Sequence, residues 1–182
     1  VHHYGWRLPN YRAGITTGAC DGTPHPPSVG ARIEHNLIHH ARHMGIGFGG
    51  YEGRIAYNVI HDTCAWTRDA GPIYGYSESD WSVARGTVIE HNLVYRAGKT
   101  PYPDAYAIYV DGIVSGVTVR GNIVVWARAG LFQNGGQANV WERNLVVACS
   151  IGIKRGDLGY GINHTRPDSP AWKNLQKNRA LY

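Results

Sequence analysis

Cysteine is scarce in this chain, which has only Cys20, Cys64 and Cys149 among its 182 residues. Three scattered cysteines are too few for a disulfide framework or a zinc knuckle. A small domain stabilised by disulfides and one stabilised by a zinc knuckle are therefore both excluded. Cysteine is also among the residue types most often buried. We therefore expect buried free thiols, and a single Cys20–Cys64 bridge is the alternative.

Long apolar runs and basic runs are also missing. No segment reaches about 18 consecutive apolar residues, so no membrane span is predicted, and the N-terminus VHHYGWRLPN lacks the charged-then-apolar pattern of a signal peptide. Lys and Arg total 18 against 13 Asp and Glu, a net charge of +5, but no run concentrates that charge, so no nucleic-acid partner is expected. The excess suits an anionic substrate. Because the chain begins without Met in an irregular stretch, we expect a processed chain or a fragment of a longer protein.

No 3.6-residue periodicity marks a helix, and short repeats of apolar residues around an asparagine take its place. The five copies are ARIEHNLIHH, GRIAYNVIHD, GTVIEHNLVY, GVTVRGNIVV and ANVWERNLVV. Their asparagines are Asn36, Asn58, Asn92, Asn122 and Asn144, at intervals of 22, 34, 30 and 22 residues. A second apolar run, such as GPIYGY or YAIYVDG, follows each copy. Each repeat thus predicts two or three short strands.

A strand-only repeat of about 22 residues cannot bury its apolar face alone and must stack on its own copies. The predicted fold is all-β: a right-handed parallel β-helix of about five to six coils in a single domain over 1–182. Residues 1–30 are expected to form an irregular N-terminal segment and 158–182 an irregular tail. The asparagines should form one column, because Asn tolerates a left-handed turn and its amide bonds the next coil. We expect exposed apolar edges at one or both ends of the stack.

The two long intervals predict loops that leave neighbouring coils side by side and form the walls of a groove. Aromatic rings stack on sugar rings, and charged planar groups fix hydroxyls or carboxylates, so the composition of these loops is typical of a carbohydrate site. Packing of the rings back onto the β-helix is the alternative. The loop residues concerned are Trp66, Arg68, Asp69, Asp80, Trp81, Arg85, Lys99, Tyr102 and Asp104.

The second strand of each repeat aligns on an inward column of Ile46, Ile73, Ile108 and Leu131. Because side chains alternate along a strand, Tyr74 and Tyr109 should point outward on adjacent coils, with Tyr76 on the same face. Asp69 and Asp104 both lie four residues before the column. If their loops return alike, the two carboxylates lie about one coil apart, near 5 Å, the separation of a retaining glycosidase pair. Turn capping is the alternative role for each aspartate.

The stretches DAGPIY, DW, RGTVI and IYVD, within a region of roughly residues 8 to 157, resemble right-handed parallel β-helix proteins related to glycoside hydrolase family 141. The resemblance implies fucosidase- or xylanase-like chemistry outside the cell or in the periplasm. It also implies an aspartate pair, which falls here on Asp69 and Asp111. This chain departs from the family pattern at Pro72, in the longer GYSES segment and at Gly112, and it is much shorter than the family's members.

The strand alignment pairs Asp69 with Asp104, whereas the resemblance pairs Asp69 with Asp111. On a straight strand Asp69 and Asp111 would lie about 23 Å apart, too far to act on one bond. Only a turn at Gly71-Pro72 that folds Asp69 back over Tyr74 brings them together. We rank Asp69 first, Asp111 second and Asp104 third as catalytic residues.

Histidines gather after the first two asparagines of the repeat. His39 and His61 occupy the same place on neighbouring coils, and His40, His43 and Asp62 lie close in sequence. Imidazole suits several divalent metals, but no HExxH or CxxC spacing is present. We expect paired polar side chains on an outer face, with neither a metal nor another cofactor.

Three function classes remain open. A glycoside hydrolase acting on a polysaccharide needs two carboxylates, one of them protonated, and this is our first prediction. A polysaccharide lyase would use a base against a uronate, and Arg68, Arg85, Lys99 and Tyr109 are available. A non-catalytic glycan-binding β-helix would need only the aromatic residues. The expected partner in every case is a polysaccharide or oligosaccharide.

Overall fold

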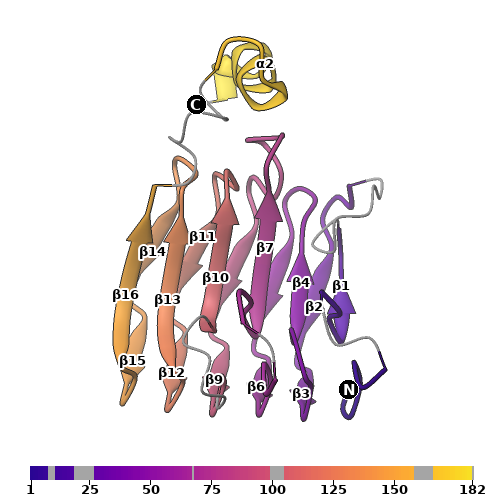
Figure 1. Ribbon diagram of the computed structural model, residues 1–182, viewed down its shortest axis with the longest axis vertical. Coiled ribbons are helices and arrows are strands. Elements are labelled where there is room, and N and C mark those ends of the chain that lie inside the picture. Colours follow the sequence, from indigo (N-terminus) through magenta and orange to yellow (C-terminus); the bar gives the residue numbers. More distant parts are fainter. Residues whose placement is uncertain (8–10, 19–26, 67, 99–104, 158–165, 182) are drawn as a thin grey trace.

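The computed structural model describes residues 1–7, 11–18, 27–66, 68–98, 105–157 and 166–181. Most of the regular structure is short strands in three all-parallel sheets (Figure 1). The first sheet contains, in spatial order, β1 (Ile15–Thr16), β4 (Ile46–Phe48), β7 (Ile73–Ser77), β10 (Tyr106–Gly112), β13 (Ala129–Asn134) and β16 (Ile151–Gly156).

The other two sheets contain five strands each. One contains β2 (Arg32–Glu34), β5 (Arg54–Ala56), β8 (Val88–Glu90), β11 (Thr118–Arg120) and β14 (Val140–Glu142). The other contains β3 (Leu37–His39), β6 (Val59–His61), β9 (Leu93–Tyr95), β12 (Ile123–Val125) and β15 (Leu145–Val147). From β2 onward the chain visits the three sheets in the same order and returns beside its own previous strand. This course fits an all-β parallel β-helix, because each repeat buries its apolar face only by stacking on its neighbours.

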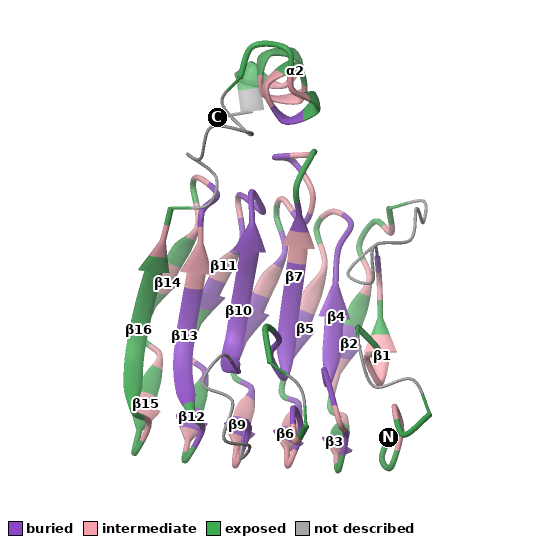
Figure 2. Ribbon diagram, in the orientation of Figure 1, coloured by how far each residue is buried: buried purple, intermediate pink, exposed green. Residues whose placement is uncertain are grey.

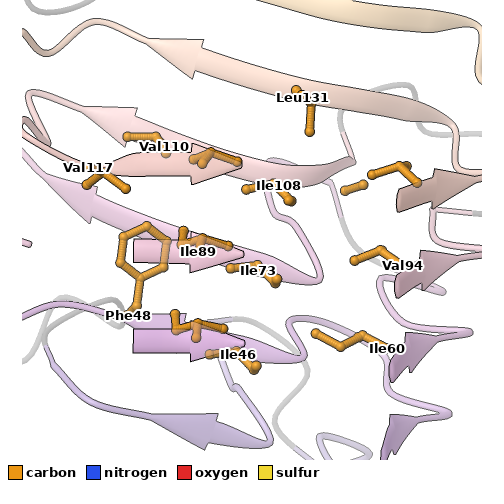
Figure 3. Packing of buried hydrophobic residues seen from close by; sticks show 14 of the residues in the cluster. Ile46, Phe48, Ile60, Ile73, Ile89, Val94, Ile108, Val110, Val117 and Leu131 are labelled. Atoms are coloured by element: carbon orange, nitrogen blue, oxygen red, sulfur yellow. The ribbon is translucent and has the colours of Figure 1, made fainter. Parts of the chain in front are cut away.

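The core is built from columns of aliphatic side chains that point inward from all three sheets (Figure 3). The predicted column is confirmed: Ile46 pairs with Ile73, Ile73 with Ile108 and Ile108 with Leu131, and all four side chains are fully buried. The other two sheets contribute matching columns, Ile33–Ile55–Ile89–Val119 and Ile38–Ile60–Val94–Val124. The alternation within each short strand therefore decides which side chains form the core.

The five asparagines form one hydrogen-bonded ladder, as predicted. Asn92 illustrates the pattern: its Nδ2 donates to Asn122 Oδ1 at 3.0 Å and to the carbonyl of Ile55 at 2.9 Å, while its Oδ1 accepts from the backbone and side-chain nitrogens of Asn58. The same bonds continue to Asn36 and Asn144. Each amide thus joins neighbouring coils and satisfies a strand carbonyl.

The prediction that these asparagines adopt the left-handed conformation is wrong. In every repeat the residue just before the asparagine has the positive φ, and the asparagines do not. The turn residues are His35, Tyr57, His91, Gly121 and Arg143, with φ between 54° and 61°. The amide can point along the stack because the preceding residue makes the turn.

Replacing Asn92 with Ala is expected to lower the free energy of unfolding by about 3 kcal/mol, because the buried donors of Asn58 and the carbonyl of Ile55 lose their partner in the ladder. Asn144→Ala is the matched control. Asn144 lies at the end of the ladder and is only half-buried, so its loss should cost less. Urea unfolding of both variants measures the difference, and equal losses would contradict the ladder's role.

The last coil leaves apolar side chains uncovered, as expected for one end of the stack. Ile153 is in register with the buried Leu131 but is 68% exposed, and β16 is exposed along most of its length (Figure 2). The exposed apolar side chains of β14, β15 and β16 are Val140, Leu145, Val147, Ile151 and Ile153.

The segments expected to be irregular contain some regular structure. In the N-terminal segment β1 pairs with β4, and His2 forms a bridge with His39. Helix α2 (Pro170–Lys177), followed by the 3₁₀ turn Arg179–Leu181, lies beyond one end of the strands (Figure 1). Ser169 caps α2 by accepting a hydrogen bond from the backbone N–H of Trp172. In the described ranges no helix has both the length and the apolar character needed to cross a membrane.

Candidate functional site

The outer face of the first sheet carries a second cluster of side chains, separate from the aliphatic core. Tyr74 pairs with Tyr109, and Tyr109 with Phe132, in the predicted register. Both tyrosines lie on the outer face of adjacent coils, but neither is open to solvent, because Tyr74 is 1% exposed and Tyr109 is 2% exposed. Their rings meet edge to face, with centroids 5.1 Å apart and planes at 68°, and Met44 and Cys64 pack in the same cluster.

Cys64 is a free thiol, and burial raises its pKa to about 12. Cys149 is also free and half-buried. Cys64 agrees with the expected buried free thiol, whereas Cys149 is free but only partly buried. Cys20 lies outside the described residues.

Asp111 lies on β10 at the edge of this aromatic cluster and is 4% exposed. Its Oδ2 accepts a hydrogen bond from Tyr74 Oη at 2.8 Å, and its Oδ1 accepts from Asn134 Nδ2 at 2.9 Å and from the N–H of Gly112 at 2.7 Å. Burial raises the pKa of this carboxyl, and the hydrogen bonds oppose the rise only in part. Asp111 is therefore a buried carboxyl that holds its proton more tightly than a free aspartate.

Asp69 occupies a turn just before β7 and is exposed. Its φ is 54°, in the left-handed region, and Ala70 then forms a bridge with Ala105. Gly71 is needed here, because a Cβ at that position would lie 2.3 Å from the carbonyl oxygen of Tyr106. The carboxylate of Asp69 accepts hydrogen bonds from Tyr109 Oη and Tyr11 Oη, both at 3.4 Å.

The turn brings Asp69 and Asp111 into one hydrogen-bonded group, which a straight strand would not allow. Tyr109 Oη donates to Asp69, and Asn134 Nδ2 donates both to Tyr109 Oη at 3.4 Å and to Asp111. Burial is the largest cause of the raised pKa of Tyr74 and of Tyr109, and the charges of both aspartates add to it. One buried and one exposed carboxyl are thus joined through Tyr109 and Asn134.

Two members of this group were missed by sequence reasoning. The position of Asn134 could have been predicted from the sequence, because the register that pairs Val110 with Gln133 places Asn134 beside Asp111. The position of Tyr11 could not have been predicted, because Tyr11 lies 58 residues before Asp69 in a stretch without periodicity.

Asp104, the third candidate, and the loop residues Lys99 and Tyr102 lie outside the described residues. The bridge between Ala70 and Ala105 has the register on which the pairing of Asp69 with Asp104 was predicted. That pairing itself stays a prediction.

Three more predicted binding residues make contacts within the scaffold. Trp81 is 1% exposed and lies against Ile113 and Ala171, so helix α2 covers it. Asp80 caps a turn by accepting hydrogen bonds from the N–H and the hydroxyl of Ser82. The side chain of Arg85 lies against Gly116 on the next coil. A Cβ added at Gly116 would lie only 2.9 Å from the Arg85 side chain.

The last three predicted binding residues, Arg68, Tyr76 and Trp66, are less buried than Tyr74 and Tyr109. Arg68 is exposed, and Tyr76 is half-buried beside Tyr74, with ring centroids 6.4 Å apart. Trp66 is 65% exposed, and the Arg42 guanidinium lies over its ring at 5.6 Å and over the ring of Trp6 at 4.4 Å. These exposed aromatics precede Asp69 in the chain, and Trp6 was not predicted.

Comparison with known proteins gives no match: no family model, no curated protein and no solved structure is similar to this chain at the significance required. The resemblance to the family 141 relatives therefore stays a hypothesis based on the motifs alone.

Protonation of Asp111 is expected to stabilise the folded chain. Burial raises the folded-state pKa of this carboxyl above its ordinary value, so the contribution is fully present below the unfolded pKa and is lost as the pH rises through the folded pKa. Asp111→Asn has no carboxyl to titrate and should lack this loss. Urea unfolding of both proteins between about pH 3 and about pH 7 tests this, and parallel profiles would contradict it.

Proposed function

We propose that this chain is a right-handed parallel β-helix of five to six coils that acts as a glycoside hydrolase, with Asp111 as the general acid and Asp69 as the nucleophile or base. The observation that carries the proposal is the joined pair of carboxyls in contrasting environments. Asp111 is buried and its pKa is raised, whereas Asp69 is exposed. A buried carboxyl with a raised pKa is suited to act as an acid, and an exposed carboxylate beside it is suited to act as a nucleophile or base.

The chemistry follows from these environments. The protonated carboxyl of Asp111 would donate its proton to the glycosidic oxygen as the bond to the sugar breaks. The carboxylate of Asp69 would either attack the anomeric carbon or remove a proton from the attacking water. Tyr109, which bonds to Asp69, and Asn134, which bonds to Asp111 and to Tyr109, would hold the two carboxyls in place.

The substrate would be a polysaccharide or oligosaccharide, bound from the side where Asp69 is exposed. Tyr11, Trp66 and Arg68 are exposed on the segments that carry or contact Asp69. Their rings and guanidinium group are the groups that stack on sugar faces and bind hydroxyls or carboxylates. An extracellular or periplasmic location fits such a substrate and is part of the proposal.

The lyase alternative has weaker support. Burial and the two aspartate charges raise the pKa of Tyr109, which makes this hydroxyl harder to ionise as a base. Arg85 is packed against Gly116, and Lys99 lies outside the described residues. Of the four candidate bases, only Arg68 is both described and exposed. The described residues thus support a carboxylate pair better than a basic centre.

The test is a screen of the chain against neutral and uronate-containing oligosaccharides, including fucosides and xylans. Release of new reducing ends without ultraviolet absorbance from a new double bond would support hydrolysis. Products with that absorbance would overturn the proposal in favour of a lyase. Binding of oligosaccharides without any turnover would overturn it in favour of a glycan-binding β-helix.

A further inference from the structure

Histidines and an aspartate form a second cluster, at the turn that follows the third sheet. Strand β3 ends at His39 and β6 ends at His61, and each is followed by a residue with a left-handed φ, His40 at 55° and Asp62 at 51°. The N-terminal residues add one level to this turn, because His2 forms a bridge with His39. The cluster therefore arises from side chains at equivalent positions on successive coils.

Two columns of rings hold the donor atoms close together. His2, His39 and His61 stack in the first column, with centroids 5.1 and 4.9 Å apart and planes at 12° and 2°. His40 stands nearly perpendicular to this column, at 82° to His39 and 80° to His61, and His3 stacks on His40 with centroids 5.2 Å apart. The fold thus fixes the direction of each imidazole.

We propose that His40, His61 and Asp62 bind a divalent transition-metal ion, with Zn²⁺ as the best match. One ligand atom from each of the three side chains lies within 4.8 Å of the others. Two imidazole nitrogens and a carboxylate oxygen form a donor set that proteins use for zinc and that leaves a coordination position open. The sequence favoured a polar outer face here, and the convergence of the three donors is what changes that interpretation.

Another turn of the same molecule provides an internal comparison. His35, Tyr57 and His91 also stack at left-handed positions, with centroids 5.1 and 5.4 Å apart. That column alternates imidazole with phenol, and in the described part of the chain only the group at His40 has three metal-binding side chains within reach of one another. Stacked rings are therefore a general product of the coil, whereas converging donors are particular to the His40 turn.

Arg96 supports Asp62 from the next coil. Its Nε donates to Asp62 Oδ1 at 3.2 Å and its Nη2 donates to Oδ2 at 2.7 Å. A partner that hydrogen-bonds a ligating carboxylate holds it in place, as is usual in metal sites, and Arg96 Nη2 also lies 3.5 Å from His61 Nδ1. His61 Nδ1 lies 2.7 Å from Asp62 Oδ2, so two of the three ligands already touch. Neither Asp69 nor Asp111 belongs to this group, so the site is separate from the proposed hydrolase.

The test is a zinc titration of tag-free protein that has been treated with a chelator and desalted. Isothermal titration calorimetry should show one Zn²⁺ per chain with a dissociation constant of about 10 μM or tighter. The melting temperature should rise by about 5 °C or more when free zinc is about 100 times the dissociation constant. Absence of binding at millimolar zinc would overturn the proposal.

The variants separate this site from other histidines. His40→Ala and His61→Ala should each weaken zinc binding by a factor of about 10 or more, whereas the double variant His35→Ala/His91→Ala should bind like the unaltered chain. Equal loss in both sets would overturn the assignment. Because His61 is largely buried, a variant that fails to fold is covered by a second measurement: anomalous diffraction at the zinc edge from crystals of the unaltered protein. A peak between His40, His61 and Asp62 is expected, and a peak elsewhere or no peak overturns the proposal.

Discussion

Replacing Asp69 with Asn is expected to lower kcat on a hydrolysed oligosaccharide by a factor of about 10²–10⁴. The amide keeps the size of the side chain but can neither attack the sugar nor accept a proton. Because Asp69 is exposed and its two hydrogen bonds are long, the melting temperature should barely change. Steady-state kinetics together with thermal unfolding measure both outcomes.

The partner of Asp69 is identified by the same change at Asp111. Asp111→Asn should be as damaging for natural glycosides, whose leaving groups need a proton, but much less damaging for aryl glycosides with acidic leaving groups. This contrast separates the acid from the nucleophile or base. Asp104→Asn tests the remaining candidate in the same assays.

Asp157→Asn is the control, because Asp157 is exposed beyond β16 and should leave the kinetics unchanged. Retention of activity in both Asp69→Asn and Asp111→Asn would rule out the proposed pair. If only Asp104→Asn abolished turnover, Asp104 would be the essential carboxyl. Both the pair of Asp69 with Asp111 and the pair of Asp69 with Asp104 would then be wrong.

Replacing Trp81 with Ala is expected to lower the free energy of unfolding by about 3–5 kcal/mol. The indole fills the space between Ile113 and helix α2, where it contacts Ala171. The backbone N–H of Trp81 also donates to Asn174 Oδ1 at 3.0 Å. Removing the ring would leave a cavity under the helix. Urea unfolding measures the loss.

Two matched variants sharpen this test. Trp126 is 65% exposed, so Trp126→Ala should change stability by no more than about 0.5 kcal/mol. Trp81→Phe should cost less than Trp81→Ala, because it keeps most of the ring and removes an Nε1–H that has no hydrogen-bond partner within the described residues. If Trp81→Ala weakened oligosaccharide binding at unchanged stability, the indole would belong to a sugar site after all.

The repeat architecture was determined by the sequence itself. The inward column through Ile73 and Ile108, the asparagine ladder and the register of Tyr74 with Tyr109 all follow from local rules: side chains alternate along a strand, and a strand-only repeat must stack on its copies. The turn before each asparagine was misassigned, because local propensity favours Asn in the left-handed region, whereas in the structure the preceding residue, even Tyr57 or Arg143, has the positive φ.

Only the tertiary structure decided which of these residues are exposed and which carboxyls meet. The return path of Asp69 depends on the close approach of Gly71 to Tyr106 and on Tyr11, which is distant in sequence. The burial of Trp81 depends on a helix about 90 residues later in the chain, whose Asn174 is 93 residues from Trp81. Periodicity encodes the side of a strand on which a residue lies, but a loop's position is set by long-range contacts that leave no period in the sequence. For that reason the scaffold was predictable, whereas the surroundings of Asp69 and Asp111 were not.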